Sequence, residues 1–248
     1  IVPLDYSLHI EDMEKILTFG DVDRVFIDGE KINELDKDGK LFKEKISLEK
    51  ASKGYKYILD LEGPEVELPK LKCEDTAAIL FTSGTTGTPK GVMLSFTNFM
   101  SSTLSSQRLF NVYSTDVFYV ILPIHHAYTM TAVFLQCMFS GACCLFGKKL
   151  VVPVILRELR EAKVTMFLAV PIIYNRFLSS IMKGIEKEGR LKASLVHFLM
   201  ELSGAIKKIT GINLGKKFFG KSILKKASLD GIRVCISGGG PLPASTFR

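Results

Sequence analysis

Cysteine and histidine are scarce in this chain of 248 residues, and their positions argue against two common kinds of stabilising site. The five cysteines form an odd set without a Cys-x-x-Cys pair, which argues against a disulfide framework. None of the four histidines lies at a ligand spacing from a cysteine, so we expect no structural zinc site and no metal ligand within the chain. We expect reduced, buried thiols in a cytoplasmic protein. The cysteines are Cys73, Cys137, Cys143, Cys144 and Cys235.

Charged residues are missing from Val117 to Gly147, a stretch long enough to suggest a membrane span. Pro123, Gln136, Gly141 and a pair of histidines interrupt its apolar character. We therefore interpret its second half as a buried helix followed by a strand rather than as a membrane-spanning segment.

Two widespread nucleotide-binding loops are also absent, although residues 81–92 are dense in glycine and hydroxyl residues. The segment reads Phe-Thr-Ser-Gly-Thr-Thr-Gly-Thr-Pro-Lys-Gly-Val. A Gly-x4-Gly-Lys-Ser/Thr loop needs a hydroxyl residue directly after the lysine, whereas Lys90 is followed by Gly91. The spacing Gly-x-Gly-x-x-Gly is missing too, so neither a P-loop NTPase nor a Rossmann oxidoreductase is indicated.

The residue types in this segment nevertheless suit the binding of phosphate oxygens. Gly84, Gly87 and Gly91 permit backbone angles that a Cβ would forbid, so that successive N–H groups can converge on one anion. The hydroxyl groups add donors, and Lys90 adds a positive charge for terminal phosphates. The alternative is a solvated turn of serine, threonine and glycine, which composition alone often produces. The predicted phosphate-binding residues are Thr82, Ser83, Gly84, Thr85, Thr86, Gly87, Thr88 and Lys90.

Three segments of the chain resemble, in the same order, motifs of the adenylate-forming enzymes. Residues 82–91 match the phosphate loop Thr-Ser-Gly-Thr-Thr-Gly-x-Pro-Lys-Gly of that family. The Leu-Pro-Ile-His-His segment at 122–126 resembles the Leu-Pro-x-x-His segment near the acyl site. The Ser-Gly-Gly-Gly-Pro-Leu segment at 237–242 resembles the Ser-Gly-Gly-Ala-Pro-Leu turn beside the adenine. Between residues 170 and 233 the chain looks most like long-chain fatty acyl-CoA synthetases.

The resemblance implies an AMP-forming acid–thiol ligase that uses ATP and coenzyme A. The carboxylate of a fatty acid would attack the α-phosphorus of ATP, and the thiol of coenzyme A would then displace AMP from the acyl adenylate. Mg²⁺ is expected with the nucleotide. Lys90 and His126 are the implied catalytic residues, and the alternative for His126 is a hydrogen-bonded core histidine. The implied adenine-side residues are Gly238, Gly239, Gly240 and Pro241.

The resemblance also implies that residues 1–248 are a partial N-terminal AMP-binding domain. Residues up to about 75 would be a peripheral part, and residues 76–248 would carry the phosphate loop and the acyl site. The family's Tyr-Gly-x-Thr-Glu motif, its ribose-binding aspartate and its small C-terminal domain with a catalytic lysine are absent from this sequence. We therefore expect little or no adenylation by this chain alone.

Other functions that share the phosphate loop stay open. An acyl-AMP ligase that loads a carrier protein, an amino-acid adenylation domain and a luciferase-like oxygenase differ in the acceptor and the pocket. A non-catalytic module that binds a nucleotide or an acyl chain is a further alternative, from a different functional class.

Short apolar runs alternate with helical patterns along the chain, which predicts an α/β fold of mainly parallel sheets covered by helices. Each of the three motifs follows a predicted strand, and ligands in such folds gather where strands end. We therefore expect the motifs to converge on one cleft. Strands are predicted at 24–28, 77–82, 117–122, 142–146, 165–170 and 232–237, and helices at 10–19, 96–110, 128–139, 154–163 and 172–185.

The positive charge of the chain is concentrated between Lys187 and Arg233, where eleven Lys or Arg stand against three Asp or Glu. From Leu191 to Ile209, apolar residues recur at the spacing of an amphipathic helix. We favour a core-facing helix with a solvated basic face. The alternatives are an element of an acyl tunnel and peripheral contact with a membrane surface through residues 187–233. Sparse aromatic residues and the lack of a nucleic-acid motif argue against a nucleic-acid partner.

Overall fold

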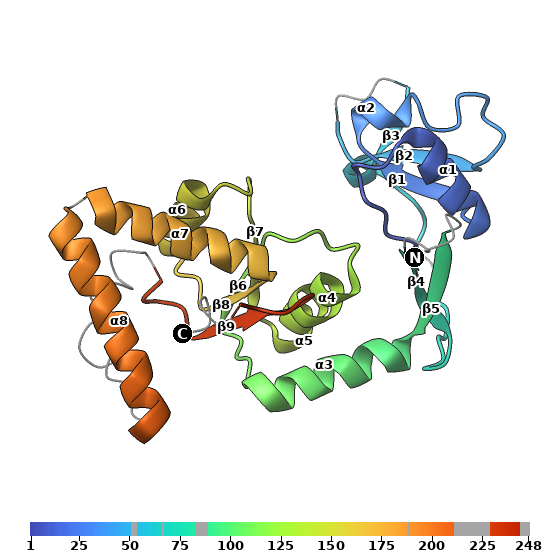
Figure 1. Cartoon of the computed structure of the whole chain (residues 1–248). Coiled ribbons are helices and arrows are strands. Elements are labelled where there is room, and N and C mark those ends of the chain that lie inside the picture. Colours follow the sequence, from blue (N-terminus) through green and yellow to red (C-terminus); the bar gives the residue numbers. More distant parts are fainter. Residues whose placement is uncertain (51–53, 66, 83–88, 188, 211–228, 244–248) are drawn as a thin grey trace. The chain divides into compact units, whose positions relative to one another are not determined.

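The computed structural model describes residues 1–248 apart from 51–53, 66, 83–88, 188, 211–228 and 244–248 (Figure 1). The chain divides into two compact units, Ile1–Ser101 (unit 1) and Ser102–Arg248 (unit 2). Each unit contains a parallel sheet and an apolar core of its own. The expected α/β fold with mainly parallel sheets is therefore confirmed, whereas the division into a peripheral part up to about residue 75 and a site-bearing part stays a prediction.

Unit 1 contains a three-stranded parallel sheet with the strand order β1-β2-β3. Helix α1 packs on β1, because Met13 and Leu17 share an apolar cluster with Val25 of the strand. The helix presents these side chains on one face, as the four-residue spacing of an amphipathic helix predicts. The elements are α1 (Ile10–Phe19), β1 (Arg24–Ile27), α2 (Gly29–Ile32), β2 (Glu44–Ser47), β3 (Lys56–Tyr57) and the short helix η1 (Ile58–Asp60).

Strands β4 (Thr76–Thr82) and β5 (Lys90–Ser95) form an antiparallel hairpin, an exception to the parallel pattern (Figure 1). The short connection between them explains the direction, because parallel strands need a crossover of a dozen or more residues. Ile1 pairs with the other edge of β4, since its amine donates to the Ala77 carbonyl oxygen and its own carbonyl oxygen accepts from the Ile79 N–H, both at 2.9 Å. Both edges of β4 are therefore hydrogen-bonded.

Helix α3 (Phe96–Phe110) begins directly after β5 and has the predicted bounds. Ser95 and Asn98 cap its first turn reciprocally. The Asn98 N–H donates to Ser95 Oγ at 3.2 Å, and the Ser95 N–H donates to Asn98 Oδ1 at 2.9 Å. These bonds satisfy backbone donors that the start of a helix would otherwise leave without partners.

Unit 2 contains a four-stranded parallel sheet with the strand order β7-β6-β8-β9. All four residues of β8 are buried, as expected of an inner strand covered on both faces. Alternate side chains enter two separate cores: Tyr119 and Phe167 face one, and Phe118 faces the other. The strands are β6 (Val117–Val120), β7 (Cys143–Phe146), β8 (Met166–Ala169) and β9 (Val234–Ser237).

Helices cover both faces of this sheet (Figure 1). Ile155 of α6 (Val152–Glu161) and Ile173 of α7 (Pro171–Lys187) pack on the Tyr119 face. Val133 packs on the other face and belongs to a helix whose middle is π-helical. The predicted helix at 128–139 is thus present, but apolar spacing did not reveal the π-helical turn. Its parts are α4 (Ala127–Thr129), η2 (Met130–Leu135) and α5 (Gln136–Ser140).

Helix α8 (Arg190–Thr210) packs against α7, but the expectation that its apolar face lies in the core is wrong. The exposed fractions of four apolar side chains on α8 range from 45% to 89%. Periodicity identifies an apolar face on a helix, but it does not identify an element that covers that face. No described helix, α8 included, is long and apolar enough to cross a membrane. The four side chains, called the α8 row below, are Leu191, Leu195, Phe198 and Leu202.

The expected burial of the cysteines is only partly correct. All five thiols are free, yet Cys137 alone is fully buried and Cys144 is half-buried. Cys143 and Cys235 are exposed because they lie on β7 and β9, the outer strands of the described sheet. Cys73, in the polar segment that precedes β4, is exposed as well.

Candidate functional site

The two ends of the predicted phosphate loop are held by the β4–β5 hairpin. Thr82, the last residue of β4, is the register partner of Lys90, the first residue of β5, and both are exposed. Directly opposed residues of an antiparallel pair project from the same face. The hydroxyl of Thr82 and the ammonium of Lys90 therefore project from the same face at the loop end of the hairpin. Ser83, Gly84, Thr85, Thr86, Gly87 and Thr88 lie outside the described residues, and their role stays a prediction.

Glycine is needed at position 91 because neighbouring side chains leave no room for a Cβ. This corrects the expectation that Gly91 serves an unusual backbone angle. Gly91 is the register partner of Phe81 and does not have a positive φ. A Cβ at this position would lie 2.8 Å from Cγ2 of Ile79 and 3.1 Å from Cζ of Phe81. The side chains of β4 therefore fill the place that a larger residue would need, at the mouth of the phosphate loop.

The Leu-Pro-Ile-His-His segment follows β6 and leads into α4. His126 directly precedes α4 and is exposed, while His125 is half-buried, and their ring centroids are 4.2 Å apart. The His126 N–H donates to the carbonyl oxygen of Pro123 at 3.3 Å, which closes a turn. The exposure of His126 disagrees with the alternative of a core histidine and leaves its imidazole accessible.

The predicted adenine-side turn begins where β9 ends. The Gly238 N–H donates to the carbonyl oxygen of Ala169, the last residue of β8, at 3.0 Å, and Gly239 has a φ of +76°. A positive φ favours glycine, so the second glycine of the turn is required by conformation. At Gly240 a Cβ would meet only Cγ of Pro171, at 3.8 Å. The alanine that the family usually carries at this position would therefore fit.

Tyr128 joins the Pro-His segment to the adenine-side turn. It lies in α4, two residues after His126, and its ring occupies the space beside Gly238, where a Cβ would be 2.6 Å from Tyr128 Cζ. Its hydroxyl is 3.4 Å from the carbonyl oxygen of Ile236 in β9. Burial raises the pKa of Tyr128 to about 12, so the phenol keeps its proton at neutral pH. Two segments more than a hundred residues apart are thus in contact within unit 2.

A second tyrosine approaches the same strand end from the opposite face of the sheet. Tyr174 of α7 lies with its hydroxyl 2.9 Å from the carbonyl oxygen of Phe167 and 2.9 Å from that of Ile236. Burial raises the pKa of Tyr174 far above its ordinary value, so this phenol also remains a donor. Sequence reasoning missed both tyrosines. The available signal was a tyrosine within an apolar helical pattern, because a buried phenol needs a polar partner.

The structure thus brings together two of the three motifs that were expected to meet. The Pro-His segment and the adenine-side turn both belong to unit 2, where Tyr128 links them. The ends of the phosphate loop belong to unit 1. The convergence of that loop with the other two motifs stays a prediction.

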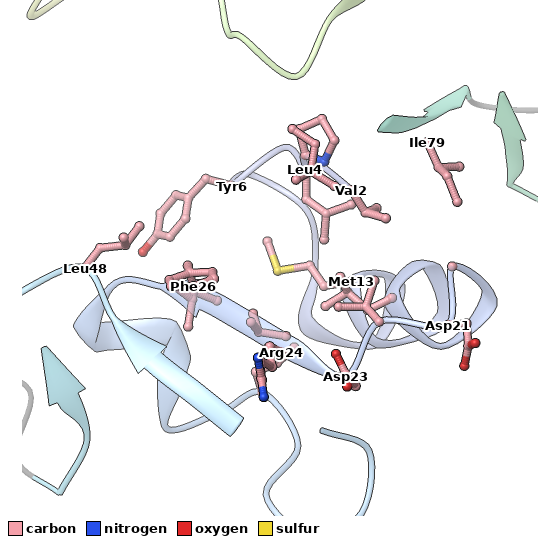
Figure 2. Close-up of a pocket in the computed structure, with 18 of the residues that line it drawn as sticks. Val2, Leu4, Tyr6, Met13, Asp21, Asp23, Arg24, Phe26, Leu48 and Ile79 are labelled. Carbon is pink, nitrogen blue, oxygen red and sulfur yellow. The ribbon is translucent and has the colours of Figure 1, made fainter. Parts of the chain in front are cut away.

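A cavity of about 660 Å³ lies in unit 1 (Figure 2). Its lining is largely apolar, with Leu4, Met13 and Phe26 among the side chains drawn, and Asp23 and Arg24 lie together on one side. Among the predicted site residues that the structure describes, none lines it.

The family described as AMP-binding enzyme matches residues 1–248, and the chain belongs to this family. The resemblance to adenylate-forming enzymes that the three motifs indicated is therefore confirmed. Fatty acyl-CoA synthetase B of Dictyostelium discoideum is 31% identical over 176 residues, which cover 68% of this chain and 26% of that protein. Long chain acyl-CoA synthetase 4 of Arabidopsis thaliana is 28% identical over 269 residues, which cover 97% of this chain and 40% of that protein.

Solved structures support the same fold. ATP-bound MatB from Rhodopseudomonas palustris has a TM-score of 0.66 at 23% identity, over 99% of this chain and 41% of that chain. The O-succinylbenzoate coenzyme A synthetase MenE of Bacillus subtilis, in complex with AMP, has a TM-score of 0.65 at 20% identity, over 99% and 49% of the two chains. The chain thus spans well under two thirds of the length of the relatives that it matches.

Proposed function

We propose that the chain serves the ATP-dependent activation of a fatty acid to an acyl adenylate, followed by thioester formation with coenzyme A. The observation that carries this proposal is the family match over the whole chain, because it includes all three motifs in order. The name of Fatty acyl-CoA synthetase B favours a fatty acid as the substrate, and the name of Long chain acyl-CoA synthetase 4 favours a long acyl chain.

In this proposal the phosphate loop holds the β- and γ-phosphates of ATP. Negative charge grows on the pyrophosphate as it leaves, and fixed N–H, hydroxyl and ammonium donors stabilise that charge most strongly in the transition state. The hydroxyl of Thr82 and the ammonium of Lys90, on one face of the hairpin, fit this role chemically. Mg²⁺ is proposed to accompany the nucleotide, whose phosphate charge it would neutralise.

The remaining roles follow the motif order. His126, exposed at the start of α4, is proposed to lie at the acyl carboxylate. Gly238, Gly239, Gly240 and Pro241 are proposed to border the adenine. Length selection would come from burial, because each methylene removed from water contributes about 0.8 kcal/mol, which favours long acyl chains steeply in an apolar tunnel.

The decisive test is a substrate panel on the longest natural polypeptide that contains this chain, with AMP formation followed with and without coenzyme A. The proposal expects AMP release that depends on both a fatty acid and coenzyme A. Release that needs a carrier protein instead would indicate an acyl-AMP ligase. Binding of ATP or a fatty acid without turnover would indicate a non-catalytic module. On the 248-residue chain alone we expect little or no pyrophosphate release.

We also propose a cytoplasmic location with peripheral contact between a membrane surface and residues 187–233. Two features support this contact. The segment carries a marked excess of Lys and Arg, and the α8 row exposes apolar side chains. Amphipathic helices of this kind bind anionic lipid surfaces through both properties together.

A further inference from the structure

The carbonyl oxygen of Ile236 is approached by hydroxyl groups from both faces of the sheet. Tyr174 reaches it from α7 at 2.9 Å, and Tyr128 reaches it from α4 at 3.4 Å. The two rings belong to different cores, since Tyr174 packs with Phe167 and Tyr128 packs with Val133. Ile236 is the last residue but one of β9, so both contacts act where the strand passes into the adenine-side turn.

Tyr174 ties two neighbouring strands together at this point. Its hydroxyl lies 2.9 Å from the carbonyl oxygens of Phe167 in β8 and of Ile236 in β9, so its single proton is shared between adjacent strands. The ring is fixed by an edge-on contact with Phe167, with centroids 5.6 Å apart. The Gly238 N–H continues the tie with its bond to Ala169. The end of β9 is therefore bound to the end of β8 at successive positions.

Tyr128 acts mainly through its ring. A hydroxyl-to-carbonyl distance of 3.4 Å is long for a hydrogen bond of this type. The ring, by contrast, leaves no room for a Cβ at residue 238, which would lie 2.6 Å from Cζ and 2.7 Å from Cε2. The backbone of Gly238 therefore packs closely against an aromatic ring of the helix that follows His126.

We propose that Tyr128 and Tyr174 are positioning residues that fix the turn formed by residues 237–241, and that Tyr128 couples this turn to the Pro-His segment. The nucleotide-related part of the inference rests on the proposed function, in which the turn borders the adenine. Tyr174 sets where β9 ends, and Tyr128 sets how closely the glycine backbone approaches α4. Neither residue needs to touch the nucleotide to affect its binding.

Hydrogen exchange measured on the 248-residue chain tests the positioning role without reference to activity. Amides of residues 237–240 should exchange about tenfold faster in Tyr174→Phe, which loses the hydroxyl but keeps the ring. Tyr128→Ala should have a similar effect, and Tyr128→Phe should behave nearly as the wild type because the ring is retained. Tyr119→Phe is the matched control, since it removes a buried hydroxyl that donates to Glu158 at 2.6 Å, away from β9.

The inference is overturned if exchange at residues 237–240 is unchanged in Tyr174→Phe and Tyr128→Ala. It is also overturned if Tyr119→Phe accelerates these amides equally, because the effect would then reflect general loss of stability. In the Tyr174 and Tyr128 variants, which leave the sequence of β6 unaltered, amides of β6 serve as the internal reference for such a loss.

Binding of AMP to the longest natural polypeptide that contains this chain tests the consequence for function. Tyr174→Phe should weaken AMP binding by about five- to tenfold, and Tyr119→Phe should leave it unchanged. If the wild type does not bind AMP, the proposed function fails while the exchange experiment still decides the positioning role. If the wild type binds and Tyr174→Phe binds equally well, the link between the tyrosines and the nucleotide is wrong.

Discussion

Thr82 and Lys90 lie directly opposite each other in the pairing of β4 with β5. This relationship fixes the distance that the phosphate loop must bridge, because a cross-strand pair holds its Cα atoms about 4.5 to 5.5 Å apart. A loop that starts and ends at one cross-strand pair is closed at its base. The donors at its two ends can then act on the same anion.

Replacing Lys90 with alanine should slow adenylation strongly in the longest natural polypeptide that contains this chain. Loss of one preorganised donor typically raises the barrier by about 3 kcal/mol, which corresponds to roughly a hundredfold lower rate. Pyrophosphate–ATP exchange measures this step. Lys43→Ala is a suitable control, because Lys43 pairs with Asp23 on an exposed surface of unit 1. Unaltered exchange in Lys90→Ala would show that the lysine does not contact the leaving pyrophosphate.

Replacing Gly91 with alanine should destabilise unit 1. The new Cβ would lie 2.8 Å from Ile79 Cγ2, and overpacking of this kind typically costs about 1–3 kcal/mol. Chemical denaturation measures the loss. Ile79→Ala removes the clashing atom. The double variant should therefore lose less unfolding free energy than the sum of the losses in the two single variants.

Gly184→Ala is the control for this substitution, since a Cβ there meets nothing within 4 Å and the residue lies inside α7. It should leave the free energy of unfolding unchanged or raise it by up to about 1 kcal/mol, because alanine favours a helix over glycine. If Gly91→Ala were as stable as the wild type, the side chains of β4 would have moved to accommodate the new Cβ, and the predicted overpacking would be wrong.

Asp116 should contribute stability that disappears in acid. Burial alone would raise the pKa of its carboxyl, but hydrogen bonds from Arg233, Thr165 and the Tyr113 N–H hold the pKa below its ordinary value of 3.8. A group with a lowered pKa in the folded state stabilises the protein above its unfolded-state pKa, and the contribution is lost as the pH falls through the folded-state pKa.

The difference in unfolding free energy between the wild type and Asp116→Asn should therefore be about 1.5–3 kcal/mol at pH 7 and shrink below pH 3.8. Denaturant unfolding at several pH values measures it. Asp12→Asn, which alters an exposed pair with Lys15, should show little difference at any pH. A difference in unfolding free energy between the wild type and Asp116→Asn that stays constant from pH 7 to pH 2 would contradict a lowered pKa of Asp116 in the folded state.

The α8 row should matter for membrane contact and little for folding. Phe198→Asp places a charge where the side chain is already 61% exposed. The free energy of unfolding should therefore change by less than about 0.5 kcal/mol. Co-sedimentation with anionic vesicles should decrease in this variant, because the apolar face and the attraction to anionic lipid are both weakened. Leu109→Asp, on an exposed position of α3, should bind vesicles like the wild type. Vesicle binding that is absent in the wild type, or equal in both variants, would exclude the contact.

Local patterns predicted the strands β1, β4, β6, β7, β8 and β9, whereas β2, β3 and β5 were not among the predicted strands. The bounds of α1 and α3 agree with the sequence prediction, because their apolar spacings end where the helices end. β6 ends at Val120 rather than Leu122, since the chain bends at Leu122. β5 was not among the predicted strands, so its antiparallel pairing with β4 was missed as well.

The contacts that build the candidate site could not be predicted from local patterns. Tyr174 and Ile236 are 62 residues apart in the sequence, and Tyr128 and Ile236 are 108 residues apart. The motifs located the strand ends and the glycine turn, but nothing in them indicated which aromatic ring would fill the space beside Gly238. Such contacts depend on the strand order β7-β6-β8-β9, which becomes known only from the structure.

The place of β9 at the outer side of the described sheet has a consequence for how the chain acquires its structure. β9 can pair with β8 only when the long connection that contains α7 and α8 brings the two strands together. Contacts between distant residues form slowly because loop closure must precede them. We therefore expect the adenine-side turn to be among the last parts of unit 2 to mature during folding. Competence for nucleotide would then arise late, when the rest of the sheet is already in place.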